Sequence, residues 1–456
     1  MRELIEFQVL DKNAEEYNLD LTVLMNKAGQ SVANYIIDNY DSGKSITIVC
    51  GNGNNGGDGY VVADILIKKG FQVNILSSGS PKSSVANKVY SSLKNKIISL
   101  DKLNDFRYNS DILLDCLIGS GIKGKVRSPL DEYITLMNDF PIIISVDVPS
   151  GIGTDCSIIP NITITFHDYK AIMNYSNSGE IILMDIDFPI EIDCMTGPGE
   201  LLLFPELNPS KYKGQNGKVA VVGGGAFAGA PSLAALGSYR SGSDLVHVFV
   251  PANSYESVSK FIPELIVHKL DGDKINSENI KILLKEKFDS VVIGPGMGKD
   301  SESFEAVQLI IDNFDNIVID ADAIKLYNFN SKNIILTPHK GEIERLGIGP
   351  TKEDMNAFAF QNNVTLILKG ETDFITNGHY FKQNKTGHPR MAVGGTGDVL
   401  AGFLGTLLAK GLSGYQSGRL GCYSLGLAGE RSYDDIGPGF LPTDLALSLS
   451  KVLKII

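Results

Sequence analysis

Cysteine is scarce in this chain of 456 residues, and the few cysteines do not cluster. The five are Cys50, Cys116, Cys156, Cys194 and Cys422; no two form a CxxC pair, and their number is odd. This spacing argues against a disulfide framework and a thiolate zinc site, and it favours a reduced, cytoplasmic setting. Cys50 and Cys116 lie in apolar runs, where cysteine serves as a small buried hydrophobic residue.

Basic residues are outnumbered as well, with 41 Lys and Arg against 53 Asp and Glu, and the formal net charge is −12. No stripe of Lys and Arg stands out along the chain. A nonspecific binder of nucleic acid or of another polyanion is therefore disfavoured.

Long hydrophobic runs are also absent. The longest weakly polar tract, residues 219–237, contains several glycines and Pro231, so it fits a strand, loop and helix better than a membrane span. The first residues, MRELIEFQVLDKNAEEYN, are charged throughout and lack the apolar core of a signal peptide. We therefore expect a soluble protein that binds neither nucleic acid nor membranes.

Apolar material for buried cores is present, because hydrophobic residues make up 43% of the chain. Near-continuous apolar runs alternate with helical patterns, which indicates parallel sheets covered on both faces. Near residue 197 the alternation stops in TGPGELLLFPELNPSKYKGQNG, a Gly- and Pro-rich stretch typical of a linker. We predict two α/β domains, residues 1–204 and 205–456.

The elements of each domain follow from these patterns. In the first domain we predict helices over 19–39, 60–69 and about 82–95, and strands in SITIVC, FQVNIL, DILLDCLIG, PIIISVDVPSG, ITITF and EIILMDI. In the second we predict a helix over 397–410 and strands in KVAVVGGG, DLVHVFVP, SVVIGPG, NIVIDAD, NIILTPH, VTLILKG and DFITNGHYF.

A bare loop, GNGNNG at residues 51–56, lies between the first predicted strand and helix. It matches the GxGxxG pattern whose backbone N–H groups approach a phosphate at a helix N-terminus. A dinucleotide fingerprint also needs an acid about 20 residues further on, yet no Asp or Glu occurs between Asp64 and Asp101. An ordinary NAD dehydrogenase is therefore disfavoured, whereas a phosphate-bearing ligand is not.

Three acids follow strand ends in the first domain: Asp58 after the bare loop, Asp115 in LLDC and Asp147 in SVDVPSG. Each could simply cap the next turn or helix. Because the carboxyl ends of parallel strands line one crevice, we instead favour a shared site.

These residues resemble a known family. The motifs GNGNNGGDG, DCLIGSGIKG and DVPSG, with LMNKAG before them, are similar to the NAD(P)H-hydrate epimerase domain over residues 1–204. The resemblance implies a Rossmann-like, three-layer αβα domain. It departs from the family at Asn26, where an acid is usual, and in the short segment after DVPSG.

The resemblance also implies the site of this domain. The residues implied to contact the hydrated dinucleotide are Asn54, Asn55, Gly56, Gly57, Asp58, Gly119, Ser120, Gly121, Ile122, Lys123, Gly124, Lys125 and Asp147. Those that match the family's potassium ligands are Asn55, Asp115 and Ser150, and hard oxygen ligands suit this ion. Asp58 and Asp147 are the candidates for proton transfer during epimerisation at the hydrated ring carbon.

A second Gly-rich turn, GGTG at residues 394–397, precedes Asp398 and an apolar helix. Its backbone N–H groups could face a transferring phosphoryl group, and Asp398 could take a proton from an attacking hydroxyl. A helix N-cap would satisfy the same pattern. The strand ends GGGAFAGAP, GPGMG, TPHKGE and LKGETD gather on the same predicted sheet edge, which favours a site that includes His339 over a structural role for this histidine.

The motifs GAP, GPGMG, TPHKGE, KGETD and GGTGDVLAG resemble the NAD(P)H-hydrate dehydratase branch of the ribokinase-like superfamily over residues 209–456. The resemblance implies a ribokinase-like α/β fold, with Asp398 as the base. The residues implied to contact substrate are Ala230, Gly298, His339, Glu342, Arg345 and Asp398. Those implied to bind the nucleotide are Lys369, Gly370, Glu371, Thr372, Asp373, His388, Pro389, Arg390, Met391, Ala392, Val393, Gly394, Gly395, Thr396 and Gly397.

Taken together, the two resemblances imply a bifunctional enzyme that repairs the hydrates NADHX and NADPHX. One domain epimerises the R and S forms, and the other dehydrates the S form with Mg²⁺ and ADP, giving AMP and phosphate. ADP is expected over ATP from the fused architecture, and a homo-oligomer from base rates. The alternatives are a kinase of a small metabolite alcohol and a first domain that binds nucleotide without catalysis.

Overall fold

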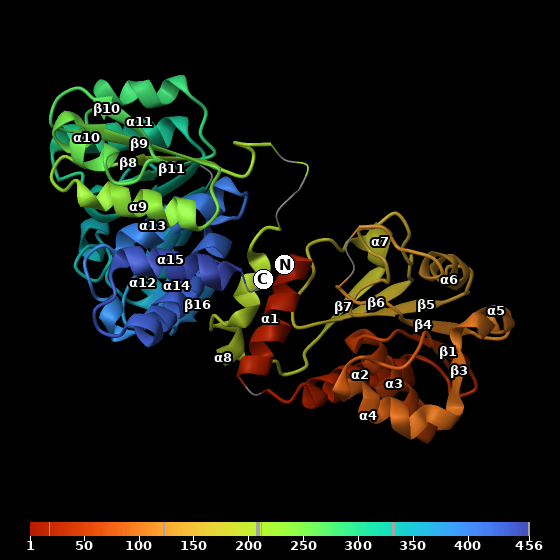
Figure 1. Ribbon diagram of the computed structural model, residues 1–456. Coiled ribbons are helices and arrows are strands. Elements are labelled where there is room, and N and C mark those ends of the chain that lie inside the picture. Colours follow the sequence, from red (N-terminus) through yellow and green to blue (C-terminus); the bar gives the residue numbers. More distant parts are fainter. Residues whose placement is uncertain (18, 122–123, 207–209, 211, 331–332, 455–456) are drawn as a thin grey trace. The chain divides into compact units, whose positions relative to one another are not determined.

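The computed structural model describes residues 1–17, 19–121, 124–206, 210, 212–330 and 333–454 (Figure 1). The chain divides into two compact units, Met1–Ile190 and Glu191–Ile456. Each unit is an α/β domain with its own sheet, as the alternation of apolar strands and helices predicts.

The first unit contains a seven-stranded sheet in the order β3-β2-β1-β4-β5-β6-β7. Every neighbouring pair is parallel, so all carboxyl ends lie at one edge. The strands are β1 (Ser45–Cys50), β2 (Gln72–Ser77), β3 (Ile97–Ser99), β4 (Ile112–Cys116), β5 (Ile143–Val146), β6 (Ile162–Phe166) and β7 (Glu180–Met184). The six predicted strands are confirmed, and the short edge strand β3 was not predicted.

Helices cover both faces of this sheet. The helices are α1 (Leu4–Glu16), α2 (Leu21–Asn39), α3 (Asn54–Lys68), α4 (Ser84–Leu93), α5 (Leu103–Phe106), α6 (Leu130–Met137) and α7 (Tyr175–Ser178), with 3₁₀ turns η1 (Lys94–Lys96) and η2 (Leu100–Lys102). Ile48 packs in the core shared with α2 and α3, whereas its neighbour Val49 packs with α5 and α6. Successive strand residues point to opposite faces, so this is the predicted three-layer αβα architecture.

Helix α3 begins earlier than the sequence predicts. It starts at Asn54 and not at residue 60, so Asn54 to Asp58 form its first turns and not a loop. Glycine in a helix is usually unfavourable, but here packing requires it. A Cβ on Gly56 would lie 2.0 Å from the carbonyl oxygen of Gly51, and one on Gly59 would lie 2.8 Å from Cys50 Sγ.

The second unit contains a nine-stranded sheet in the order β10-β9-β8-β11-β12-β13-β14-β15-β16. The strands are β8 (Lys218–Val222), β9 (Leu245–Pro251), β10 (Ile266–Leu270), β11 (Ser290–Ile293), β12 (Asn316–Ile319), β13 (Asn333–Leu336), β14 (Thr365–Leu368), β15 (Asp373–Thr376) and β16 (Phe381–Asn384). The pairs β14–β15 and β15–β16 are antiparallel, and the others are parallel. The predicted single strand DFITNGHYF is wrong: the chain turns near Gly378 (φ +85°), which gives a hairpin. Strand β10 was not predicted.

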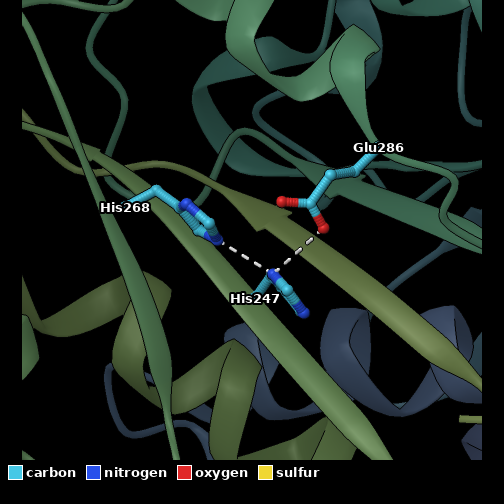
Figure 2. A group of neighbouring side chains, drawn as sticks. All are labelled: His247, His268 and Glu286. Atoms are coloured by element: carbon cyan, nitrogen blue, oxygen red, sulfur yellow. Dashed lines mark hydrogen bonds and ion pairs between the residues drawn. The ribbon is translucent and has the colours of Figure 1, made fainter.

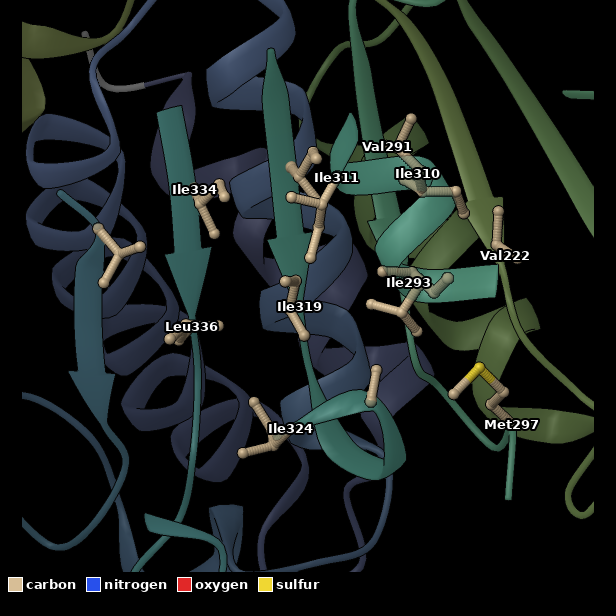
Figure 3. Packing of buried hydrophobic residues seen from close by; sticks show 14 of the residues in the cluster. Val222, Val291, Ile293, Met297, Ile310, Ile311, Ile319, Ile324, Ile334 and Leu336 are labelled. Carbon is tan, nitrogen blue, oxygen red and sulfur yellow. The ribbon is translucent and has the colours of Figure 1, made fainter. Parts of the chain in front are cut away.

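The helices of the second unit also cover both faces of its sheet. They are α8 (Ile190–Asp193, at the boundary), α9 (Gly229–Arg240), α10 (Ala252–Ser259), α11 (Ser301–Asn313), α12 (Lys352–Asn362), α13 (Thr396–Ala409), α14 (Gly414–Ile436) and α15 (Pro442–Leu453), with 3₁₀ turns η3 (Pro198–Leu203), η4 (Asn279–Lys285), η5 (Ala321–Ala323), η6 (Ile343–Leu346) and η7 (Pro389–Met391). On one face, Ile293, Ile319 and Leu336 of neighbouring strands form a core with Ile310 of α11 (Figure 3). Helices α9, α13 and α14 pack on the other face.

The unit boundary at 190/191 lies before the predicted boundary at 204/205. The segment between them belongs to the second unit because it pairs with β16: Thr196 N donates to Gln383 O and Gln383 N donates to Cys194 O. The buried carboxylate of Glu200 also lies 3.2 Å from Lys382 Nζ. Residues 191–204 are therefore part of the second domain and not a linker between the domains, although the sequence here is rich in Gly and Pro.

No helix in the described part of the chain is long and apolar enough to cross a membrane.

Candidate active sites

A cavity of about 830 Å³ opens at the carboxyl edge of the sheet in the first unit. Its wall contains residues that follow β1, β2, β4, β5 and β6, together with residues of α1 and α2. The predicted residues that line it are Asn54, Asn55, Gly56, Asp58, Gly119, Ser120, Gly121 and Asp147. Ligands of open parallel sheets bind at this edge, so the predicted site and the cavity coincide.

Not all of the predicted residues reach the cavity. Gly57 is buried in α3, where a Cβ would lie 2.5 Å from Met25 Cε, and it is not a lining residue. Gly124 and Lys125 also lie outside the lining, and the Lys125 side chain is 87% exposed. Ile122 and Lys123 lie outside the described residues.

Carboxyl groups converge within this cavity. Asp58 and Asp147 both line it, and so does Asp11 of α1. Burial, followed by the negative charges of Asp147 and Asp11, raises the pKa of Asp58 well above its usual value. Burial and Asp147 also raise the pKa of Asp11, to about 7. The raised pKa of Asp58 favours its protonated form, which suits a proton donor.

A buried lysine neutralises part of this charge. Lys170, four residues after the end of β6, has only 1% of its side chain exposed. Its Nζ donates to Asp147 Oδ1 at 2.5 Å, to Thr165 Oγ1 at 2.6 Å and to Phe166 O at 2.9 Å. All three ammonium hydrogens are thus used, and the lysine fixes the orientation of the Asp147 carboxylate.

Asp147 itself occupies an unusual backbone conformation, with φ +65°. A non-glycine residue in the left-handed region is strained and persists where the surroundings fix it. Here its backbone N donates to Ile164 O of β6 and Lys170 holds its side chain. In this conformation Asp147 lines the cavity.

Asp115 does not line the cavity but lies fully buried beside it. Its Oδ1 accepts from Ser150 Oγ at 2.5 Å, and its Oδ2 accepts from Ser150 N and Ser145 Oγ. Burial raises the pKa of Asp115, and these hydrogen bonds oppose the rise. Ser150 Oγ also lies 3.2 Å from Ile118 O, and Asn55 Nδ2 donates to the same oxygen.

Asn55 Oδ1 is buried, and no described residue donates a hydrogen bond to it. An unsatisfied buried oxygen carries a cost and calls for an explanation. It belongs to a group of hard oxygen atoms from Asn55, Asp115, Ser150 and Ile118, which are linked by the contacts above. These donors fit an alkali cation such as K⁺.

In the second unit, Asp398 lies in the first turn of α13, behind Gly395 at φ +105°. Burial, followed by the charge of Asp320, raises the pKa of Asp398 to about 7, and Lys369 opposes the rise. Lys369 Nζ donates to Asp320 Oδ1 at 2.7 Å, and Thr337 Oγ1 donates to the same atom at 2.6 Å. Residues that follow β12, β13 and β14 therefore meet at the Asp320 carboxylate, and its charge acts on Asp398 at the N-terminus of α13.

His339 and Glu342 lie together after β13. His339 N donates to Glu342 Oε2 at 3.0 Å, and His339 Nε2 lies 3.4 Å from Glu342 Oε1. The His339 side chain is 58% exposed and that of Glu342 is 8% exposed, so the carboxylate is fixed and the imidazole faces outward. Arg345 donates to Ala321 O at 3.3 Å, which ties this segment to the end of β12.

The turn GPGMG after β11 packs against the start of α9. A Cβ on Gly296 would lie 2.2 Å from Phe227 O and 3.2 Å from the Cβ of Ala230, so the two predicted substrate segments touch. Gly298 N donates to Asp322 Oδ2 at 3.0 Å. Ala230 and the turn that ends at Gly298 thus lie on the same sheet edge as Asp320.

Several predicted nucleotide-binding residues also have local roles. Asp373 accepts from Gly370 N and from Asn384 Nδ2, so its side chain joins the turn between β14 and β15 to the end of β16. His388 stacks on Tyr433 with ring centroids 3.7 Å apart. The remaining predicted residues are Glu371 and Thr372 in the turn before β15, and Pro389, Arg390, Met391, Ala392, Val393, Gly394, Thr396 and Gly397 in η7 and the start of α13.

Four residues of these sites were not predicted: Asp11, Lys170, Asp320 and Asp322. Asp320 follows the buried strand in NIVIDAD, which is the same signal that indicated Asp115 and Asp147. Lys170 also follows a strand end. Asp11 carries no such signal, because it belongs to a charged helix that the sequence analysis left unassigned.

The comparisons with known proteins agree with this geometry. A family model described as NAD(P)H-hydrate dehydratase matches residues 219–451, and one described as YjeF-related protein N-terminus matches residues 21–172. The bifunctional NAD(P)H-hydrate repair enzyme Nnr of Methanocaldococcus jannaschii is 34% identical, covering 99% of this chain and 93% of that protein. The enzyme of the same name from Methanothermobacter thermautotrophicus is 32% identical, covering 98% and 94%.

Among solved structures, the second unit is similar to the ADP/ATP-dependent NAD(P)H-hydrate dehydratase from Bacillus subtilis, co-crystallized with ATP and Mg²⁺. The TM-score is 0.51 at 25% identity, covering 56% of this chain and 96% of that chain. The ribokinase-like fold and both resemblances read from the motifs are therefore confirmed. The chain belongs to the family of bifunctional NAD(P)H-hydrate repair enzymes.

Proposed function

We propose that the chain restores hydrated NADH and NADPH, and that each unit performs one of two steps. The observation that supports this most directly is that each unit gathers its own acids and a lysine at the carboxyl edge of its own sheet. Two separate acid clusters fit two reactions better than one. Family membership supports the identity of the substrates.

In the first unit, the proposed reaction is epimerisation at the hydrated carbon of the nicotinamide ring. Asp58, whose pKa is raised, donates a proton to the hydroxyl group, which leaves this carbon as water. Water then adds to the other face of the same carbon and gives a proton to Asp147, which Lys170 holds. The proton count balances, and the bond that breaks is remade.

K⁺ is proposed to be held by Asn55, Asp115 and Ser150, where it would organise the loop around phosphate. The buried, unsatisfied Asn55 Oδ1 supports this fit. Removal of K⁺ by dialysis into a buffer with a large organic cation should lower epimerisation, and restoring K⁺ should recover it. Asn55→Ala should remove this K⁺ response.

In the second unit, the proposed reaction is dehydration of the S hydrate at the expense of a nucleotide. Asp398 takes the proton of the ring hydroxyl, whose oxygen attacks the terminal phosphoryl group. Phosphate then leaves the ring carbon, assisted by the lone pair of the ring nitrogen. The resulting cation loses a proton from the adjacent ring carbon to solvent, which forms the ring double bond, and the products are NAD(P)H, AMP and phosphate. Lys369 supplies positive charge beside the Gly395–Gly397 turn, where a Cβ on Gly397 would lie 3.2 Å from its Nζ.

The proposed nucleotide is ADP together with Mg²⁺. The buried carboxylate of Glu342 offers the hard oxygen donors that Mg²⁺ prefers, and when bound this ion neutralises charge on the phosphates. Segments 369–373 and 388–397 are proposed to bind the nucleotide, whereas Ala230, Gly298, His339 and Arg345 are proposed to contact the hydrated ring.

The proposal also covers the cellular compartment and the oligomeric state of the protein. All five cysteines are free, which supports a reduced, cytoplasmic setting. A homo-oligomer is proposed from the general frequency of symmetric assemblies.

The test mixes the purified protein with a prepared blend of R and S NADH hydrates, Mg²⁺ and ADP, with ATP in a parallel reaction. Absorbance of the reduced ring should return for the whole blend, with one phosphate released per turnover. Recovery of only the S half would contradict the epimerase assignment. A stable phosphorylated product with no recovery of NADH would favour the small-metabolite kinase.

A further inference from the structure

Two histidines and a glutamate lie close together toward the amino ends of the parallel strands in the second unit. His247 of β9 and His268 of β10 are joined by a contact of 2.8 Å between Nδ1 and Nε2 (Figure 2). Glu286, directly after η4, brings Oε2 to 3.9 Å from the same His247 nitrogen. One donor atom from each residue lies within 4.8 Å of the others.

The two imidazoles meet edge to edge. Their centroids are 5.1 Å apart and their planes differ by 13°. This separation is close to the sum of the N–N distance and the two distances from centroid to nitrogen, so the nitrogens point at each other along the line of centroids. Two neighbouring imidazole nitrogens with a carboxylate beside them are a donor set that divalent transition metals use in proteins.

The imidazoles are also in the protonation state that a metal requires. Burial, followed by the Lys218 ammonium and His268, lowers the pKa of His247 to about 4. Burial likewise lowers the pKa of His268. Both rings are therefore neutral at pH 7. A metal ion would replace the hydrogen shared between them, and the donor ring would move its proton to its other nitrogen, with no net proton release.

Aromatic side chains pack against both imidazoles, and the partly exposed glutamate leaves the cluster accessible to an ion from solvent. Phe249 stacks on His268 with centroids 4.3 Å apart, and Phe288 packs edge-on against His247 at 5.1 Å. The His247 side chain is 8% exposed, whereas that of Glu286 is 41% exposed. An ion could enter past the glutamate and keep a water molecule as its fourth ligand.

Lys218 occupies the position of a competing cation. Its Nζ donates to Glu286 Oε2 at 2.8 Å and lies 4.6 Å from the Phe288 ring centroid. A metal ion would have to release this carboxylate from the ammonium. The side chain of Lys218 is 23% exposed, so it has room to turn toward solvent.

This cluster is separate from the proposed dehydratase site. Lys218 is the first residue of β8, and His247 and His268 are each the third residue of their strands. Glu286 precedes β11. The cluster thus lies toward the amino edge of the sheet, whereas Asp320, Lys369 and Asp398 lie at its carboxyl edge.

We propose that His247 Nδ1, His268 Nε2 and the Glu286 carboxylate bind one divalent transition-metal ion of the zinc class, which fastens the edge strand β10 and its neighbour β9 to the segment before β11. Two nitrogens bound tetrahedrally at about 2.0–2.1 Å from one zinc lie about 3.3 Å apart, so the present pair has to open by about 0.5 Å and both rings have to tilt until their nitrogens face the ion. The ion is structural, because it lies away from the proposed chemistry.

The experiment titrates full-length, chelator-treated protein with Zn²⁺ by calorimetry and with Co²⁺ by absorbance. The wild-type protein should bind one equivalent, and Co²⁺ should show the visible bands of tetrahedral N/O coordination. His268→Ala and Glu286→Gln should each weaken this binding by at least about 10-fold, with Zn²⁺ no longer raising the thermal transition of the second unit.

Two further variants sharpen the test. His379→Ala changes an exposed histidine in the β15–β16 turn and should bind Zn²⁺ as the wild type does. Lys218→Gln removes the competing ammonium and should bind more tightly. No Zn²⁺ binding by the wild type, or equal binding by His268→Ala, Glu286→Gln and His379→Ala, would overturn the proposal. Weaker binding by Lys218→Gln would also contradict it.

Discussion

Asp398, the proposed base of dehydration, is buried at a cost in free energy. As the proposed base it must be ionised, yet its pKa is raised to about 7 by burial and by Asp320. Dehydration should therefore increase as the pH rises through about 7. Asp398→Asn should lower kcat by about 10²–10⁴-fold, as expected for loss of a general base. Initial rates from pH 5.5 to 9 check both points, with the exposed Asp434→Asn as control.

The same group predicts how stability depends on pH. Because the folded pKa of Asp398 exceeds the ordinary value of 3.8, the native state binds more protons than the unfolded state between about pH 4 and 7. The free energy of unfolding should then decrease as the pH rises through this window. Asp398→Asn should flatten this dependence and stabilise the second unit at pH 8. Urea titrations at pH 5 and 8 test it, and a steeper dependence in the variant would contradict it.

Lys170 should act through Asp147 and not on the substrate directly. Lys170→Met removes the ammonium that donates to Asp147 Oδ1, so the carboxylate should lose the contact that fixes its orientation. The kcat of epimerisation should therefore fall by about 10-fold or more. Lys12→Met changes an exposed lysine of α1 and serves as control. An unchanged kcat with lower stability would assign Lys170 a purely structural role.

At the level of elements, η3 is fixed by a buried charge cluster. Glu200 is fully buried and lies 3.2 Å from Lys382 of β16 and 3.5 Å from Arg419 of α14. Removing one partner of such a cluster leaves uncompensated buried charge. Glu200→Gln should therefore destabilise the second unit by about 3–5 kcal/mol. Glu278→Gln, at a position 84% exposed, should change stability by less than about 0.5 kcal/mol. Chemical denaturation measures both.

The close packing of α9 and α13 depends on glycine. A Cβ on Gly402 would lie 1.8 Å from Ala234 O, so Gly402→Ala should push α13 away from α9. Because Asp398 begins the same helix, the variant should lose both stability and dehydration, whereas epimerisation should persist. Gly229→Ala, where nothing lies within 4 Å of the new Cβ, should keep or slightly raise stability. Normal dehydration in Gly402→Ala would show that α13 tolerates the shift.

At the scale of the whole molecule, the chain contains separate cores for its two sheets. Residues 1–190 and 191–456 should therefore fold when produced separately. The first fragment should interconvert the hydrates without nucleotide, and the second should restore only the S half. In the intact chain, ADP with Mg²⁺ at 100 times its Kd should stabilise only the second unit, by about 2.7 kcal/mol. Calorimetry with two transitions checks this, and a single transition shifted as a whole would contradict it.

Local pattern determined most of the fold. Runs such as SITIVC and NIILTPH are long enough, and apolar enough on both faces, to form central parallel strands, so their positions and alternation with helices could be predicted. The same logic placed Asp115 and Asp147 at the carboxyl ends of their strands, whereas the GGTG turn before an apolar helix indicated Asp398. The exceptions are α1, β3 and β10, whose local signals are weak, and the β15–β16 hairpin, whose Asn377–Gly378 pair is a turn signal that the prediction of one strand overlooked.

The contacts between distant side chains arise from the tertiary fold. Lys369 and Asp320 are 49 positions apart, and Lys170 and Asp147 are 23 apart, so no spacing in the sequence joins them. Asp11 reaches the first cavity because α1 packs beside it, and His247 meets His268 because β9 and β10 pair in one register. Most strands and turns follow from the local pattern of residues, and the available chemical groups follow from residue identity, so both could be predicted without the fold. The pKa of Asp58, the orientation of Asp147 and the histidine pair depend on burial and on distant charges, which arise only when the sheets form.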